Sequence, residues 1–262
     1  MKRITATIIL CTSAIALMAQ PKTAREEIKE NPYLAGSNYL DYDRQLPDFK
    51  YTAAPEGYVP FYFSHYGRHG SRWLIGHRDY TRVADVLRKA DQQGKLTAKG
   101  CETLEKLEKF IPCTVKRFGD LTTVGERQHH GIGRRMAEHF PEIFKAKDVP
   151  IDARSTVVPR CILSMMAECE ELMAANPSAH IHNDVSESLQ YYLNQPWDGR
   201  VKEASKQVKW EEKRAYQERI SKPARLMQSL FNDQQWVADS VNAVNLMYDI
   251  FEVAANMQSH DT

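Results

Sequence analysis

Residues 58–72 read YVPFYFSHYGRHGSR, an apolar run that ends in a basic turn flanked by glycines. The aromatic and β-branched residues at 58–63 predict a buried strand. Gly67 and Gly70 allow the backbone to turn tightly or to approach a ligand closely. The stretch therefore predicts an α/β fold in which the basic residues of the turn emerge together at one end of a sheet.

The basic side chains of residues 68–72, the basic turn, suit phosphoryl transfer. Arg68 and Arg72 carry planar, permanently charged guanidinium groups that match phosphate oxygens in a bidentate way. The His69 imidazole between them is a candidate in-line nucleophile. A solvated surface turn is the alternative interpretation of the same charges.

The basic turn resembles the RHGxR signature of the histidine acid phosphatases. This branch of the histidine phosphatase superfamily contains phytases and multiple inositol polyphosphate phosphatases. Family members have a proline two places after the second arginine, where this chain has Trp73-Leu74. The resemblance implies a phosphoglycerate-mutase-like three-layer α/β core with a mainly parallel sheet and a helical cap insertion. It implies no metal and no other cofactor.

Two further segments are similar to the family. Residues 121–128, LTTVGERQ, resemble its LTxxGxxQ element, which leads into a helix near the catalytic loop. Arg154-Ser155, Arg160 and Ser164 resemble its R-x-S-x-x-x-R-x-x-x-S pattern, in which the second arginine, here Arg160, is a third phosphate ligand. Pro159 suits the first helical position, which places Arg160 in a first turn that favours anions. For Arg154, a structural ion pair is the alternative to a role in the site.

The N-terminal residues predict export of the protein. Residues 1–20 combine a basic start with a largely apolar stretch and read as a signal peptide. A retained membrane helix is the alternative. Cleavage leaves residues 21–262 as the phosphatase domain, periplasmic or secreted, with no stable membrane association and with a helical insertion at about 186–230.

Composition limits the partners of the chain. Hydrophobic residues make up 42% and charged residues 26% of the 262 residues, as in ordinary globular proteins. The formal charge is +1, and it becomes −1 once Lys2 and Arg3 leave with the signal peptide. This balance argues against a nucleic-acid binder. A local disulfide between Cys101 and Cys113, or free thiols, remain equal alternatives for the cysteines.

Hydrophobic periodicity and turn residues predict the other elements. Helices are predicted at 79–95, 99–110, 123–144, 160–175 and 233–258, and strands at 149–155 and 179–185.

Adjacent histidines His129 and His130 point about 100° apart on a helix, so they make a poor chelate for a metal ion and are expected in solvated or capping roles.

The proton donor of the family comes from a later His-Asp or His-Ala-Glu motif. His260-Asp261 matches the residues of the His-Asp motif, but it ends a predicted helix rather than a strand and lies 191 residues after His69. Either this pair is the acid motif, or the chain is the N-terminal portion of a truncated family member.

The resemblance implies a phosphomonoesterase that acts through a phosphohistidine at His69, with Arg68, Arg72 and Arg160 as ligands of the phosphoryl group. Its substrates are then phosphorylated small molecules, first among them inositol polyphosphates such as phytate. A broad-specificity acid phosphatase is the alternative within this class. A catalytically impaired phosphate-binding remnant is the alternative from a different class.

Overall fold

A computed structural model of the chain describes residues 22–42, 52–194, 200, 203–204 and 210–261. The predicted signal peptide, residues 1–20, lies outside these ranges. Among the described residues, no helix has both the length and the apolar composition needed to cross a membrane.

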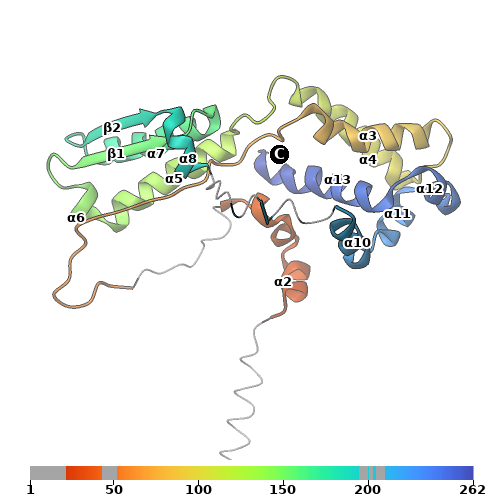
Figure 1. Cartoon of the computed structure of the whole chain (residues 1–262), viewed down its shortest axis with the longest axis horizontal. Coiled ribbons are helices and arrows are strands. Elements are labelled where there is room, and N and C mark those ends of the chain that lie inside the picture. Colours follow the sequence, from red (N-terminus) through yellow and green to blue (C-terminus); the bar gives the residue numbers. More distant parts are fainter. Residues whose placement is uncertain (1–21, 43–51, 195–199, 201–202, 205–209, 262) are drawn as a thin grey trace, which may run out of the picture.

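The structure is α/β, with helices in two groups on either side of the basic turn (Figure 1). The strands are β1 (Pro150–Ser155) and β2 (His180–Val185). The α-helices are α2 (Ala24–Glu30), α3 (His77–Asp91), α4 (Ala98–Phe110), α5 (Thr123–His139), α6 (Pro141–Phe144), α7 (Pro159–Ala175), α8 (Gln190–Leu193), α10 (Trp210–Ile220), α11 (Ala224–Leu230), α12 (Gln234–Ser240) and α13 (Ala243–Asn256). Short 3₁₀ segments are η1 (Pro32–Tyr39), η3 (Ile111–Thr114), η4 (Glu187–Leu189) and η5 (Met257–Ser259).

The first group consists of the sheet and the helices around α5 and α7. Strands β1 and β2 pair in parallel, from Pro150 opposite His180 to Ser155 opposite Val185. A parallel pair needs a crossover connection, and α7 provides it. Buried side chains of α5, α6 and α7 form a small core against the sheet: Met136, Ala137, Phe144 and Leu172.

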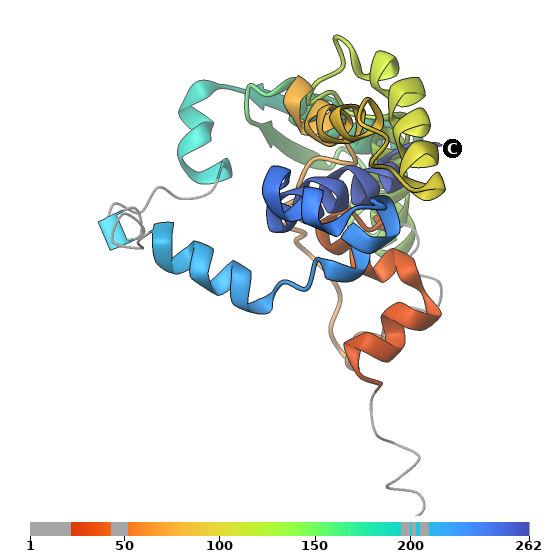
Figure 2. The same cartoon turned by 90° about the vertical axis from the view of Figure 1, so that its right-hand side faces the viewer.

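The second group is a helical cluster of α3, α4, α11, α12 and α13. Its largest fully buried side chains include Tyr80, Phe231 and Leu74, the last of which directly follows the basic turn. The basic turn therefore connects two hydrophobic cores, one on each side of it. Figure 2 shows α10 at the edge of this cluster, where it lines one pocket with the start of α13. The described residues between 186 and 230 are helical in η4, α8, α10 and α11.

Most predicted elements are present with small shifts of their bounds. Two predicted helices are each divided in two. The helix at 123–144 breaks before Pro141, which lacks the N–H that would continue it. The helix at 233–258 breaks at Val241, which is extended, and Asn242 then caps α13 by accepting the N–H of Asn245 at 3.0 Å.

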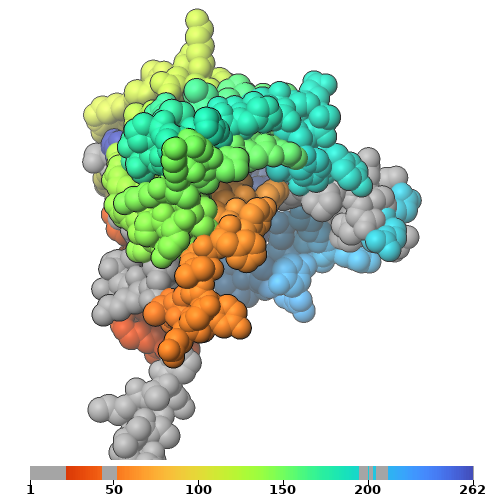
Figure 3. All heavy atoms as spheres, turned by 90° about the vertical axis from the view of Figure 1, so that its left-hand side faces the viewer, coloured from red at the N-terminus to blue at the C-terminus, as the bar shows by residue number. Residues whose placement is uncertain are grey.

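The predicted buried strand at 58–63 is wrong. Tyr58, Val59, Phe61 and Tyr62 are 74%, 75%, 92% and 74% exposed, and none of them belongs to a strand. Figure 3 shows this stretch, in orange, at the surface. Strand propensity describes how side chains fit a pleated, half-buried surface, so it has no effect without a partner strand. In the described residues β1 pairs with β2 alone, and the larger predicted sheet is not seen.

The four cysteines of the described chain are free thiols. Cys101 and Cys113 are exposed, while Cys161 and Cys169 are partly buried. Of the two alternatives that the sequence left open, the structure shows free thiols rather than a local disulfide.

Candidate functional site

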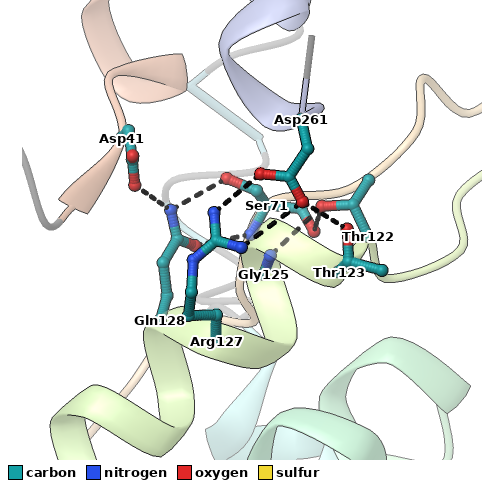
Figure 4. A network of polar contacts seen from close by, with 8 residues as sticks. All are labelled: Asp41, Ser71, Thr122, Thr123, Gly125, Arg127, Gln128 and Asp261. Atoms are coloured by element: carbon teal, nitrogen blue, oxygen red, sulfur yellow. Dashed lines mark hydrogen bonds and ion pairs between the residues drawn. The ribbon is translucent and has the colours of Figure 1, made fainter.

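The backbone of the basic turn is held by side chains of α5 and α7. The N–H of Gly70 donates to Ser164 Oγ at 3.1 Å, and the N–H of Ser71 donates to Gln128 Oε1 at 2.9 Å. The carbonyl of Ser71 accepts from the backbone N–H of Thr122 at 2.9 Å and from its hydroxyl at 3.0 Å (Figure 4). The N-terminal end of α5 and the first turns of α7 thus fix the turn from two sides.

Two glycines allow this close approach. A Cβ added to Gly70 would lie 2.7 Å from the Cα of Gly125, so no side chain fits between the turn and the start of α5. Thr122 caps α5 there by accepting the N–H of Gly125 at 3.1 Å. The glycine in the LTxxGxxQ-like element therefore lets the helix end contact the turn directly.

The helical cluster holds the other end of the turn. Asn256, at the end of α13, donates to the carbonyl of Arg72 at 2.9 Å. It also accepts from the hydroxyl of Tyr80 at 3.2 Å, and that hydroxyl accepts the N–H of Leu74 at 2.6 Å. Asn256 and Tyr80 are fully buried. Both hydrophobic cores therefore contribute to the geometry of one turn.

His69 is oriented as a nucleophile would be. Its Nδ1 lies 2.8 Å from the carbonyl oxygen of Gly70. A carbonyl only accepts, so Nδ1 carries the proton and Nε2 keeps its lone pair. Burial lowers the pKa of His69 to about 4, and the charges of Arg160, Arg68 and Arg72 act in the same direction. The ring is therefore neutral, with an available lone pair, above about pH 4.

The charges of the three arginines predicted as phosphate ligands all act on the ionisation of His69. Arg68 is exposed, and Arg72 donates to the carbonyl of Trp73 at 2.8 Å. Burial lowers the pKa of Arg160, and the like charges of Arg72 and Arg68 add to this effect. An anion placed among the three guanidinium groups would relieve their mutual repulsion.

One buried N–H group of Arg160 has no hydrogen-bond partner among the described residues. This group is Nε, whereas Nη1 donates to the carbonyl of Gly119 at 3.2 Å. A buried donor without a partner costs free energy. The charges of Arg68, Arg72 and Arg160 thus all act on His69, and the roles of these four residues remain predictions.

His69 lines two cavities. One, of about 570 Å³, extends along β1 and is largely apolar. Its polar and charged lining residues include His65, Arg68, His69, His129, Ser164 and Glu168, as well as Asp152 and Arg154 of β1. The other, of about 380 Å³, includes Arg68, Arg72 and Gln128, whereas Arg160 lines neither cavity. Among the described residues of 199–225, no basic side chain lines either cavity.

The sequence analysis missed a buried acidic group in the larger cavity. Glu168 Oε1 lies 2.6 Å from Nδ1 of His129 and 3.6 Å from Nε2 of His65. The solvated or capping role predicted for His129 is wrong, because α5 and α7 pack tightly at Gly133 and bury its ring. The available signal was the spacing of Arg160, Ser164 and Glu168, which places them on one face of α7.

Two other candidates lie in ion pairs. Arg154 pairs with Asp152 at 2.6 Å, as in the structural alternative that the sequence left open, and both residues also line the 570 Å³ cavity. Asp261 accepts from Arg127 and from the hydroxyl of Thr123, each at 2.9 Å (Figure 4). Asp261 lines neither of the two cavities that His69 lines.

Gln128→Ala is expected to lower the free energy of unfolding by about 1–3 kcal/mol, because the buried N–H of Ser71 loses its acceptor. Urea unfolding measures this difference. Gln235→Ala serves as the control, since Gln235 makes an exposed contact with Asp239, and a change within about 0.5 kcal/mol is expected there. Equal effects of the two substitutions would contradict the role assigned to Gln128.

His260→Phe is expected to reduce the loss of stability in acid. Burial lowers the pKa of His260 from 6.5 to about 4, so the unfolded chain takes up this proton more readily than the folded chain. Its contribution to stability is therefore lost as the pH falls from about 6.5 through about 4. Phenylalanine preserves an aromatic ring beside Trp73, which lies 4.2 Å away between ring centroids. Melting temperatures at pH 7 and 4.5 test this, and an unchanged difference between them would refute it.

The comparisons with known proteins show a shared fold and no matching family. No family model matches the chain, and no curated protein matches it. The chain is similar to Bifidobacterium longum multiple inositol polyphosphate phosphatase in complex with inositol hexasulfate, with a TM-score of 0.39 and 27% identity over 48% of this chain and 26% of that one. In its complex with phosphate, the TM-score is 0.52 with 17% identity, over 81% of this chain. The chain spans 58% of that structure and shares its fold over this length.

Proposed function

We propose that the chain binds phosphomonoesters and hydrolyses them through a phosphohistidine formed at His69. The observation that carries this proposal is a neutral imidazole whose Nδ1 is engaged by a carbonyl and whose pKa is lowered by burial and by the charges of three arginines. The sequence resemblance of the basic turn to RHGxR supports the same assignment. The fold shared with a phosphatase agrees with it.

In the proposed reaction, the lone pair on Nε2 of His69 attacks phosphorus. The bond to the leaving oxygen breaks, and its electron pair leaves with that oxygen. Arg68, Arg72 and Arg160 stabilise the negative charge of the phosphoryl oxygens, where preorganised cations contribute most. Water then attacks the phosphohistidine and releases phosphate. Proton transfer to the leaving oxygen requires a further group.

For substrate, we propose inositol polyphosphates such as phytate. The protein that shares this fold is named for that class of substrate. The permanent charges of Arg68, Arg72 and Arg160 favour substrates of high negative charge. The described basic side chains of residues 199–225 lie outside both cavities.

Export remains part of the proposal. Residues 1–20 are proposed to be cleaved and the remainder to be periplasmic or secreted. N-terminal sequencing of the protein recovered from each cell fraction tests this. A protein that begins at Met1 in the membrane fraction would overturn it.

Release of inorganic phosphate by the purified chain tests the main proposal. Phytate, p-nitrophenyl phosphate and the diester bis(p-nitrophenyl) phosphate are compared from about pH 3 to 8. We expect turnover of both monoesters, a preference for phytate and no turnover of the diester. Equal rates for all monoesters would indicate a broad-specificity phosphatase. Binding of phosphate or vanadate with no turnover would replace the hydrolase with a phosphate-binding protein.

A further inference from the structure

The segment that leads into α5 pairs with the end of the basic turn. The N–H of Thr122 donates to the carbonyl of Ser71 at 2.9 Å (Figure 4), and the carbonyl of Asp120 accepts the N–H of Trp73 at 2.9 Å. Arg72 lies between these two hydrogen bonds, in an isolated antiparallel bridge to the same segment. The main chain of Arg72 is therefore fixed by the residues just before α5.

Gly119 extends this pairing and also contacts Arg160. Its N–H donates to the carbonyl of Leu74 at 2.9 Å, and its carbonyl accepts from Nη1 of Arg160 at 3.2 Å. Gly119 is buried. Arg72 belongs to the basic turn and Arg160 to the first turn of α7, so the segment before α5 contacts two arginines that come from different parts of the chain.

The conformation at residue 119 requires glycine. Its φ is +74°, in the left-handed region that residues with side chains rarely adopt. A Cβ built on Gly119 would lie 3.2 Å from Nη1 of Arg160 and 3.3 Å from Cδ1 of Ile75, both closer than an ordinary van der Waals contact. A side chain at this position would therefore strain the backbone and displace the guanidinium group of Arg160.

Arg160 depends on this contact for its orientation. Among the described residues, the Gly119 carbonyl is the acceptor that holds its guanidinium group, and its buried Nε has no hydrogen-bond partner. A free arginine side chain populates many rotamers, so a defined orientation requires such an anchor. Burial lowers the pKa of His69 most, and of the three arginines the charge of Arg160 adds the largest effect. The orientation of Arg160 therefore acts directly on the His69 ring.

We propose that Gly119 is a positioning residue, which holds the guanidinium group of Arg160 in register with Arg72 so that both bind one phosphoryl group. This inference rests on the proposed function, in which both arginines stabilise the charge of that group. The carbonyl of Gly119 orients Arg160, and the backbone pairing of the same segment orients Arg72. Such positions matter because a displacement of about 1 Å, even one caused far from the chemistry, lowers a rate by up to about 100-fold.

A general loss of stability is the competing explanation, because alanine at a positive φ destabilises a fold wherever it occurs. Gly94 provides the matched control. Its φ is +66°, and a Cβ added there meets no atom of the described chain within 4 Å, its two neighbours in sequence aside. Gly94→Ala therefore introduces similar backbone strain without touching Arg160.

The test compares Gly119→Ala and Gly94→Ala with the unmodified full chain on p-nitrophenyl phosphate. We expect kcat/KM to fall about 100-fold in Gly119→Ala and less than about threefold in Gly94→Ala, although both substitutions lower the melting temperature. In the Arg160→Gln background, Gly119→Ala is expected to lower kcat/KM by less than about a further threefold, since the group that it displaces is already absent. Vanadate affinity is measured for the same proteins and should fall in the same order.

Gly119→Asn separates strain from displacement, because asparagine tolerates a positive φ better than alanine but still places a Cβ against Arg160. It should lose at least as much kcat/KM as Gly119→Ala, with a smaller fall in melting temperature. It also decides the test if Gly119→Ala does not fold.

Equal losses of kcat/KM in Gly119→Ala and Gly94→Ala would overturn the inference and leave the role of His69 intact. A loss from Gly119→Ala that is the same with and without Arg160 would do so as well. An unmodified chain that binds vanadate without turnover would overturn the proposed hydrolysis, and the vanadate affinities of the variants would then decide the role of Gly119. A chain that neither binds vanadate nor turns over the ester would overturn both.

Discussion

His69→Ala is expected to lower the rate of phosphate release from phytate and from p-nitrophenyl phosphate by at least about 10⁴-fold, because removing a nucleophile removes the covalent route entirely. The fold should survive the substitution. The imidazole makes one local hydrogen bond, to the carbonyl of the next residue. Circular dichroism and phosphate affinity of the variant check that the loss lies in the chemistry.

His182→Ala is the control for this experiment. The His182 side chain is 78% exposed on β2 and pairs with Asp152 at 3.6 Å, away from the basic turn. Its rates should stay within about twofold of those of the unmodified chain, as expected for a surface substitution. Retention of more than about a tenth of the activity in His69→Ala would refute the covalent mechanism.

Arg160→Gln is expected to lower kcat/KM for phosphomonoesters by about 10³-fold, the loss typical of removing one preorganised group that stabilises transition-state charge. Glutamine keeps a donor for the Gly119 carbonyl, so a hydrogen bond between the start of α7 and residue 119 can still form. Steady-state kinetics on p-nitrophenyl phosphate measure the effect. Vanadate affinity should fall along with kcat/KM.

Arg134→Gln is the matched control, since Arg134 also contacts α7, through Glu171 at 3.1 Å, but is exposed and lines neither cavity. Less than about a threefold change in kcat/KM is expected. Similar losses in the two variants would contradict the assignment of Arg160 as a phosphate ligand and would indicate a general electrostatic effect.

The elements that local signals predict well are those whose ends carry caps or prolines. For α7, Pro159 at the first helical position and a three-and-four apolar spacing led to bounds within one residue of the observed helix. For α13, the apolar spacing continued through the Val241–Asn242 break, so the capping role of Asn242 was hidden. Periodicity thus finds helices more reliably than it divides them.

The segment at 58–63 shows what local signals cannot decide. Its aromatic and β-branched residues favour a strand, yet a strand needs a hydrogen-bonded neighbour. Whether one is present depends on the arrangement of the whole sheet. Phe63 is partly buried, and its ring lies 5.0 Å from that of Phe140 and 5.1 Å from that of Phe144 between centroids.

For the site, residues that are close in sequence were predictable and residues that support them were not. Arg68, His69 and Arg72 share one turn, and a motif places Arg160. In contrast, Asn256 reaches Arg72 from 184 residues away, which only packing can reveal.

The most direct test of the central claim is to trap the phosphorylated intermediate. The chain is mixed with p-nitrophenyl phosphate, quenched in alkali, in which phosphohistidine survives, and digested for mass spectrometry. The account predicts a phosphoryl group on the peptide that contains His69, assigned to that residue by fragmentation and missing from His69→Ala. Turnover with no phosphorylation of His69, or with phosphorylation at another residue, would contradict it.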